Sequence, residues 1–185
     1  MYWLLECGSP PQGHMALVSY DRDDPWRNWR IGQRFERPPN EPVVATIERN
    51  EGGLFVEMWD VPLPLMSTRL ATAIREAGVA NIEFYKAEIQ DKNDGSVNRD
   101  YFAFNLIGTI AAADMRKSRY EAPGGEVISV DFDSLVLDTD KARGEQMFRL
   151  AESINGIVVR DDVKGAIERA GINTLTFMVP EDWMG

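Results

Sequence analysis

Residues 65–84 read LMSTRLATAIREAGVANIEF and residues 158–177 read VVRDDVKGAIERAGINTLTF, and the two stretches share one pattern. Each predicts a short amphipathic helix that runs into a strand. Ser67 is a favourable N-cap for the first helix and Asp161 or Asp162 for the second, while Gly78 and Gly171 close them. The apolar stripes have i, i+3, i+4, i+7 spacing: Leu70, Ala73, Ile74 and Ala77 in the first stretch, and Val163, Ala166, Ile167 and Ala170 in the second.

The two stretches align without a gap, which pairs Ala77-Gly78 with Ala170-Gly171 and Phe84 with Phe177. A solenoid needs about three or more repeats to stack a core, so two copies are too few. We therefore expect a pseudo-symmetric pair of helix-strand units inside one fold.

The rest of the chain is organised around these units. Residues 1–41 are rich in turn-forming residues and look irregular, apart from a strand candidate at Tyr2–Leu5. Alternating runs at Val43–Ile47 and Leu54–Met58 flank Asn50-Glu-Gly-Gly53, which predicts a β-hairpin over residues 42–60. Residues 61–185 would form the core. We predict one α+β domain over residues 1–185, with a mixed or antiparallel sheet and a few short helices.

Charge narrows the classes of partner. The chain has 185 residues and a net charge of −10, and residues 121–162 alone hold ten acidic against four basic residues. Such a field repels nucleic acid and anionic membranes and attracts basic proteins, although it also describes a solubilising surface. No apolar run approaches the length of a membrane span, the start lacks a secretory leader, and Cys7 is the only cysteine. We expect a cytoplasmic protein in a reducing compartment.

Groups that could support catalysis are scarce. His14 is the only histidine, and Cys7 is the one nucleophile of ordinary reactivity. One Cys and one His cannot form a zinc site without several carboxylates, and the glycine pairs lack the Lys-Ser/Thr of a phosphate-binding loop. We expect no enzymatic activity, no metal and no cofactor.

One stretch mixes arginines with aromatic residues. The aromatic residues Trp26, Trp29 and Phe35, together with Gly32, recur at threes, which fits a short helical turn or a knot of aromatics covering an edge of the core. Neighbouring acids offset the charge of the arginines, so we interpret the stretch as a salt-bridged cap. Trp and Arg are nevertheless enriched at binding hot spots, which keeps it as a candidate contact surface. The arginines are Arg22, Arg27, Arg30, Arg34 and Arg37.

The order of these features resembles immunity protein family eleven of bacterial polymorphic toxin systems. The resemblance covers roughly residues 26–180 and lies in structural rather than catalytic motifs. Those motifs are Trp29–Gly32, Pro64–Ser67, Ala77-Gly78-Val79, Asn81–Phe84, Tyr101–Gly108, Asp114 with Ser118, Ile128 leading into Leu135–Asp138, Met147–Glu152 and Ala170–Phe177.

The resemblance implies a protein that binds a cognate toxin in the producing cell and blocks it, and a basic nuclease would suit an acidic inhibitor. The expected partner is therefore a toxin, with no nucleic acid or membrane, and the oligomeric state stays open between monomer and homodimer. Two alternatives remain: a small hydrolase using carboxylates in a cleft, and a non-catalytic homodimeric scaffold. The residues predicted to contact the toxin are Asp131, Asp133, Asp138, Asp140, Asp161 and Asp162, with Trp26 and Trp29 as anchors.

Overall fold

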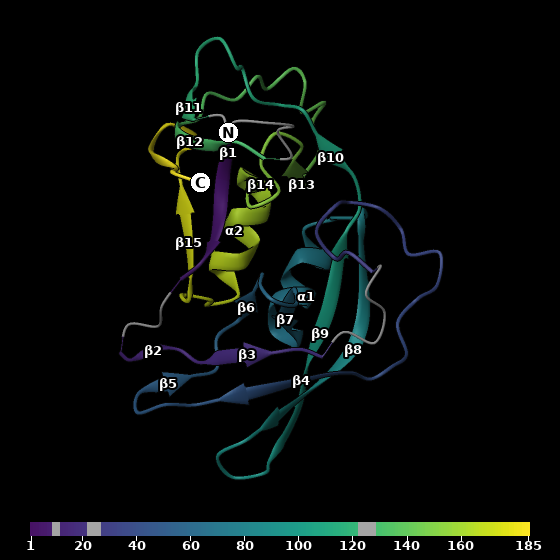
Figure 1. Cartoon of the computed structure of the whole chain (residues 1–185). Helices are drawn as coiled ribbons and strands as arrows, with labels where there is room; N and C mark the ends of the chain where they lie inside the picture. Colours follow the sequence, from purple (N-terminus) through teal and green to yellow (C-terminus); the bar gives the residue numbers. More distant parts are fainter. Residues whose placement is uncertain (9–11, 22–26, 122–128) are drawn as a thin grey trace.

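The computed structural model describes residues 1–8, 12–21, 27–121 and 129–185. The described chain is mainly β, with two α-helices and mixed sheets (Figure 1). The α+β prediction therefore holds for the mixed sheets and short helices and understates the β content. No helix in these ranges is long and apolar enough to cross a membrane.

A six-stranded sheet has the order β3-β4-β8-β9-β7-β6 and is nearly closed, like a barrel. The Trp59 indole of β6 donates a hydrogen bond of 3.1 Å to the Ala16 carbonyl beside β3, which links the two edges. The strands are β3 (Leu17–Ser19), β4 (Val43–Glu48), β6 (Met58–Trp59), β7 (Leu65–Ser67), β8 (Ile82–Asp91) and β9 (Val97–Leu106).

A five-stranded sheet has the order β10-β13-β14-β1-β15. Its strands are β1 (Tyr2–Cys7), β10 (Thr109–Ile110), β13 (Met147–Leu150), β14 (Ile157–Arg160) and β15 (Leu175–Met178). Two small two-stranded sheets pair β2 (His14–Met15) with β5 (Gly53–Leu54), and β11 (Arg119–Glu121) with β12 (Asp131–Ser134). A 3-10 helix, η1 (Pro180–Asp182), follows β15.

The predicted pair of helix-strand units is confirmed. Helix α1 (Thr68–Glu76) joins β7 to β8, and α2 (Asp161–Arg169) joins β14 to β15, so both helices begin and end at positions that the gapless alignment makes equivalent. Ser67 caps α1, since its Oγ accepts the Leu70 N–H at 3.0 Å. The second cap prediction is wrong: Arg160 is the N-cap residue and makes no side-chain cap bond, while Asp161 and Asp162 lie in the first turn.

Each unit also contains a third strand that the alignment does not include. Strand β9 lies between β7 and β8, and β1 lies between β14 and β15, in both cases antiparallel to its two neighbours. The registers match: Ser67 faces Tyr101 in the first unit, and its equivalent Arg160 faces Tyr2 in the second. The chain thus builds the same four-element motif twice, once with the central strand last and once with it first (Figure 1).

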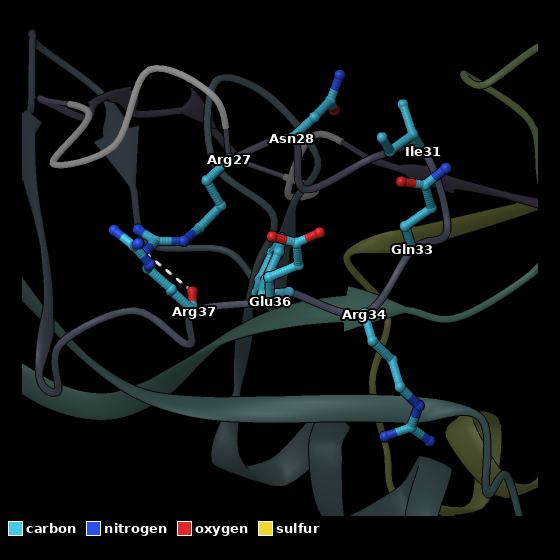
Figure 2. A pocket seen from close by; sticks show the side chains of 8 residues that line it. Arg27, Asn28, Ile31, Gln33, Arg34, Glu36 and Arg37 are labelled. Carbon is cyan, nitrogen blue, oxygen red and sulfur yellow. Dashed lines mark hydrogen bonds between the residues drawn. The ribbon is translucent and has the colours of Figure 1, made fainter.

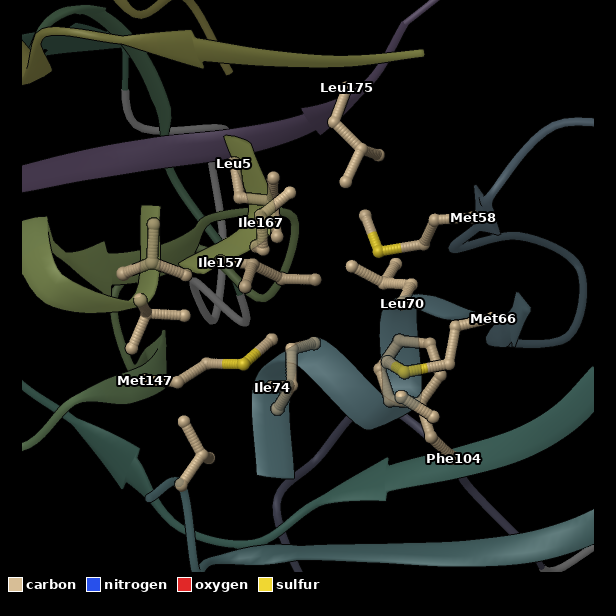
Figure 3. Close-up of a cluster of buried hydrophobic side chains, with 14 of the residues drawn as sticks. Leu5, Met58, Met66, Leu70, Ile74, Phe104, Met147, Ile157, Ile167 and Leu175 are labelled. Carbon is tan, nitrogen blue, oxygen red and sulfur yellow. The ribbon is translucent and has the colours of Figure 1, made fainter. Parts of the chain in front are cut away.

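The two helices pack against each other between the two large sheets. Side chains from both units converge there, among them Ile74 of α1, Ile167 of α2 and Leu5 of β1 (Figure 3). The opposite faces of both sheets are covered by two further apolar clusters, so β7, β13 and most of β14 are buried on both sides.

The predicted hairpin over residues 42–60 is wrong. Strand β4 pairs with β3 and, in parallel, with β8, while the two-residue β5 pairs in parallel with β2. The alternation of Val43–Glu48 does reflect a strand, but its neighbours come from distant parts of the sequence.

A buried ion network ties the N-terminal segment to both sheets. Arg149 on β13 is 0% exposed, and its guanidinium bonds both oxygens of Asp60 and the Ile154 carbonyl at 2.7 Å. Arg30 reaches the same carboxylate, with Nε 3.0 Å from Oδ2, and donates to Asn155 Oδ1 at 2.6 Å. One carboxylate therefore serves two arginines.

Candidate functional site

The two-stranded sheet of β11 and β12 presents acidic side chains on its outer face. Along β12 the burial alternates, because Phe132 turns inward against the rings of Tyr120 and Trp183, each 6.0 Å away. Asp131 and Asp133 therefore point outward and are exposed. The period-two geometry of a strand places both carboxylates on the same side.

Glu121 of β11 lies directly opposite Asp131 in this sheet. Like charges facing each other across strands destabilise a sheet. Among the residues that the structure describes, neither these two carboxylates nor that of Asp133 has a hydrogen-bond or ion-pair partner. The outer face of β11 and β12 thus gathers three carboxylates without a partner in the described ranges, and the exposed cation of this sheet is Arg119, two residues before Glu121. The sequence shows that Glu121 is one of the acidic residues of this segment, but only the strand register places it opposite Asp131.

The loop between β12 and β13 carries the next two predicted residues. Asp140 is exposed, and within the described ranges its carboxylate is unpaired. Asp138 is half-buried, its carboxylate lies 3.7 Å from Lys141 Nζ, and its backbone N–H donates to the Ala112 carbonyl. Ala142 of this loop and Phe132 of β12 belong to the same apolar cluster. Four of the six predicted acids therefore border one cluster.

Asp161 and Asp162 serve structural contacts at the start of α2. Asp161 accepts the Trp3 indole N–H at 2.9 Å. Asp162 receives two bonds from the Arg160 guanidinium and one from Gln146, and these bonds hold the pKa of its carboxyl well below its usual range. Carboxylates committed in this way have less to offer a partner than those of β12.

The structure describes only one of the two tryptophans predicted to anchor the toxin. Trp26 lies outside the described residues. Trp29 is 5% exposed and packs edge-on against Phe35, with ring centres 4.8 Å apart, and against Tyr85. Its segment forms a knot of aromatics, which is one of the two arrangements that the spacing predicts, and residues 27–35 contain no helix. Because Trp29 belongs to the core, we do not carry it forward as a contact residue.

A hollow of about 450 Å³ opens beside this segment, lined by Arg27, Arg34, Glu36 and Arg37 among others (Figure 2). Two of these arginines, Arg27 and Arg34, already have internal roles. Arg27 lies over the Phe35 ring and donates to the Arg37 carbonyl, and Arg34, which points away from them, pairs with Glu83. These contacts agree with the predicted aromatic-rich cap, but the acids that pair with Arg30 and Arg34 are Asp60 and Glu83, which lie far away in the sequence, rather than the neighbouring acids.

The residues considered for catalysis are not arranged for it. Burial raises the pKa of the Cys7 thiol to about 12, so the thiol stays protonated near neutrality and is a poor nucleophile. His14 lies exposed on the separate short strand β2. Across the described ranges, no three His, Cys, Asp or Glu side chains are grouped so that they could hold a metal ion.

Comparison with known families gives one match. A family model described as an immunity protein family, Imm11, matches residues 10–182. No curated protein matches the chain. The matched range spans most of both helix-strand units and all of β11 and β12.

Proposed function

Since the chain belongs to the Imm11 immunity protein family, which implies neutralisation of a cognate toxin, we propose that it blocks a basic toxin with the acidic face of β11 and β12. Members of such a family are typically not enzymes, which agrees with the expectation from the sequence. We propose the chemical class of the toxin, the contact face and the mechanism of blocking together.

The observation that carries the proposal is the cross-strand pair of Glu121 and Asp131 with Asp133 beside it. Such a face costs stability in the free protein. A partner that supplies cations would remove that cost on binding, so the repulsion favours the complex. In a basic nuclease, the cations that hold nucleic-acid phosphates would serve this purpose.

The mechanism we propose is occlusion in the cytoplasm of the producing cell. Carboxylates of this face occupy the groove that otherwise holds the substrate's phosphates, and the acidic field speeds association at low ionic strength. Asp140 extends the face along the neighbouring loop. Asp161 and Asp162 contribute to the field rather than to direct contacts, because Trp3 and Arg160 engage them.

The test is co-expression with the product of the adjacent open reading frame. If that product is toxic, this chain should rescue growth and form a stable complex with it. A lethal neighbour that is neither bound nor neutralised would refute the proposal.

Charge reversal locates the contact face. The double variant Asp131→Lys and Asp133→Lys should lower the association rate at low salt by about tenfold or more and flatten its salt dependence. The control, Glu48→Lys and Glu51→Lys, makes the same change in net charge at two exposed acids elsewhere. Equal rates for the two double variants would show that this face is not the contact surface.

A further inference from the structure

A groove lies where the two helix-strand units meet. It has a volume of about 620 Å³, and most of its lining comes from the loop after α1, residues 77–81, and from residues 143–146. Gln146 crosses between the units, since its Nε2 donates to the Ala77 carbonyl at 2.5 Å and to Asp162 Oδ2 at 3.1 Å. The groove is thus built on a fixed junction.

Three arginines line the groove, and their partners differ. Arg34 is paired with Glu83, and Arg160 with Asp162 and the Gly144 carbonyl. Arg143 is exposed, and the described part of the chain offers its guanidinium neither a hydrogen bond nor an ion pair. It is the cation in this groove that remains available for a ligand, and the exposed Glu145, which also lines the groove, places one carboxylate beside it.

The backbone at Arg143 disfavours an arginine. Its φ is +51°, and no other non-glycine residue in the described ranges has a positive φ. Gly144 follows with φ +77°, and the Glu145 N–H donates to the Ala142 carbonyl at 2.9 Å, which are features of a type I′ turn. Asn, Asp or Gly is preferred at the Arg143 position of such a turn. The turn itself therefore gives no reason for an arginine.

We propose that this groove binds a carboxylate-bearing segment of the toxin and that Arg143 holds the carboxylate. The inference rests on the proposed function and adds a contact of opposite sign to it. A guanidinium can engage a carboxylate through two parallel hydrogen bonds, and residues kept in unfavourable backbone conformations cluster at functional sites.

The consequence is a mixed pattern of charge on the surface of the complex. Toxin cations meet the acids of β12, while one toxin carboxylate meets Arg143 beside the exposed Asp140 and Glu145. A basic protein without that carboxylate would leave Arg143 without a partner in the complex. The groove therefore selects the cognate toxin among basic proteins.

Two substitutions separate binding from stability. Arg143→Asn creates the favoured Asn-Gly turn and removes the charge, so Tm should rise by about 2 °C while Kd for the toxin weakens by about tenfold or more. Arg143→Glu should weaken Kd further, because it places a carboxylate against a carboxylate. The control is Arg169→Asn, at the opposite end of α2, which should leave Kd unchanged.

Titration calorimetry with the product of the adjacent open reading frame and thermal melts provide both readouts. If the wild-type chain binds but Arg143→Asn binds as tightly, the groove inference fails and neutralisation stands. If Arg143→Glu binds as well as Arg143→Asn or better, the ligand is not a carboxylate. If the wild-type chain does not bind at all, the proposed function itself fails.

Discussion

Asp60 neutralises two arginines, so its replacement by asparagine tests the buried network directly. In Asp60→Asn the shape is kept and the charge is lost. Arg149, which is 0% exposed, would keep only the Ile154 carbonyl as a full-strength acceptor. Removing one partner of a buried ion pair typically costs about 3–5 kcal/mol. Arg30 should add little to this, because its side chain is 20% exposed and also bonds Asn155.

A loss of that size is large for a protein of this length. With a typical free energy of unfolding of about 5–15 kcal/mol, the variant would lose a third or more of it in most of that range. At about 2–4 °C per kcal/mol, Tm should fall by roughly 6–20 °C. Urea unfolding followed by tryptophan fluorescence and circular dichroism gives the free energy, provided that the slope m is unchanged.

The double variant Asp60→Asn with Arg149→Met provides the refutation. Because it removes the buried cation together with the carboxylate, keeps apolar volume in the core and leaves only the partly exposed Arg30 without its acid, it should recover most of the loss. A loss below about 1 kcal/mol in Asp60→Asn, or a double variant as unstable as the sum of the singles, would refute the reasoning. Glu88→Gln, which breaks the exposed pair with Arg99, is the control and should change stability by less than about 1 kcal/mol.

Two further predictions concern Ser67 and Cys7. Ser67→Ala should lower the free energy of unfolding in urea by about 1–2 kcal/mol, because it removes the cap of α1 and a partner of Glu57. Thr72→Ala, on the exposed face of α1, is the control and should lower it clearly less. Equal losses for the two variants would contradict the cap. Cys7 should react slowly with a disulfide reagent at pH 8 in the folded protein and rapidly in urea, because its pKa is raised to about 12 in the fold against about 8.5 unfolded. The same difference makes stability fall as pH rises above about 8.5, since the unfolded thiol then releases its proton first; fast labelling of the folded protein at pH 8 would refute the burial.

The sequence predicts the helix-strand units well because their signals are local. Ser67, the apolar stripes and the glycines Gly78 and Gly171 lie within a few residues of the structure that they specify, and both glycines adopt a positive φ. The third strand of each unit escapes the alignment for a different reason. Tyr2–Cys7 reads YWLLEC and Tyr101–Leu106 reads YFAFNL, which share little more than their first residue and occupy different places in chain order.

The wrong hairpin prediction shows that a local sequence pattern can identify a strand without identifying its neighbours in the sheet. Val43–Glu48 alternates as a half-buried strand should, but alternation says nothing about which strand lies beside it. Its neighbours β3 and β8 lie far from it in the sequence, so local turn chemistry does not specify the pairing.

The candidate site could be predicted only in part. Net charge locates the acidic segment, and the structure divides its members by their partners. Asp131 and Asp133 have no partner among the residues that the structure describes, while Asp161 and Asp162 bond Trp3 and Arg160. Trp29 sits in an irregular segment, where no periodicity separates buried from exposed positions. Arg143 gave no signal in the sequence, because its importance lies in a backbone angle.

The position of β1 in its sheet sets the order in which the two helix-strand units can fold during synthesis. This strand leaves the ribosome about 150 residues before β14 and β15, the two strands that flank it in the sheet. At about 5–20 residues per second the wait is roughly 8–30 s. Meanwhile β7, α1, β8 and β9 are contiguous and can assemble first. Each newly synthesised molecule thus has a delay between the completion of its first unit and that of its second.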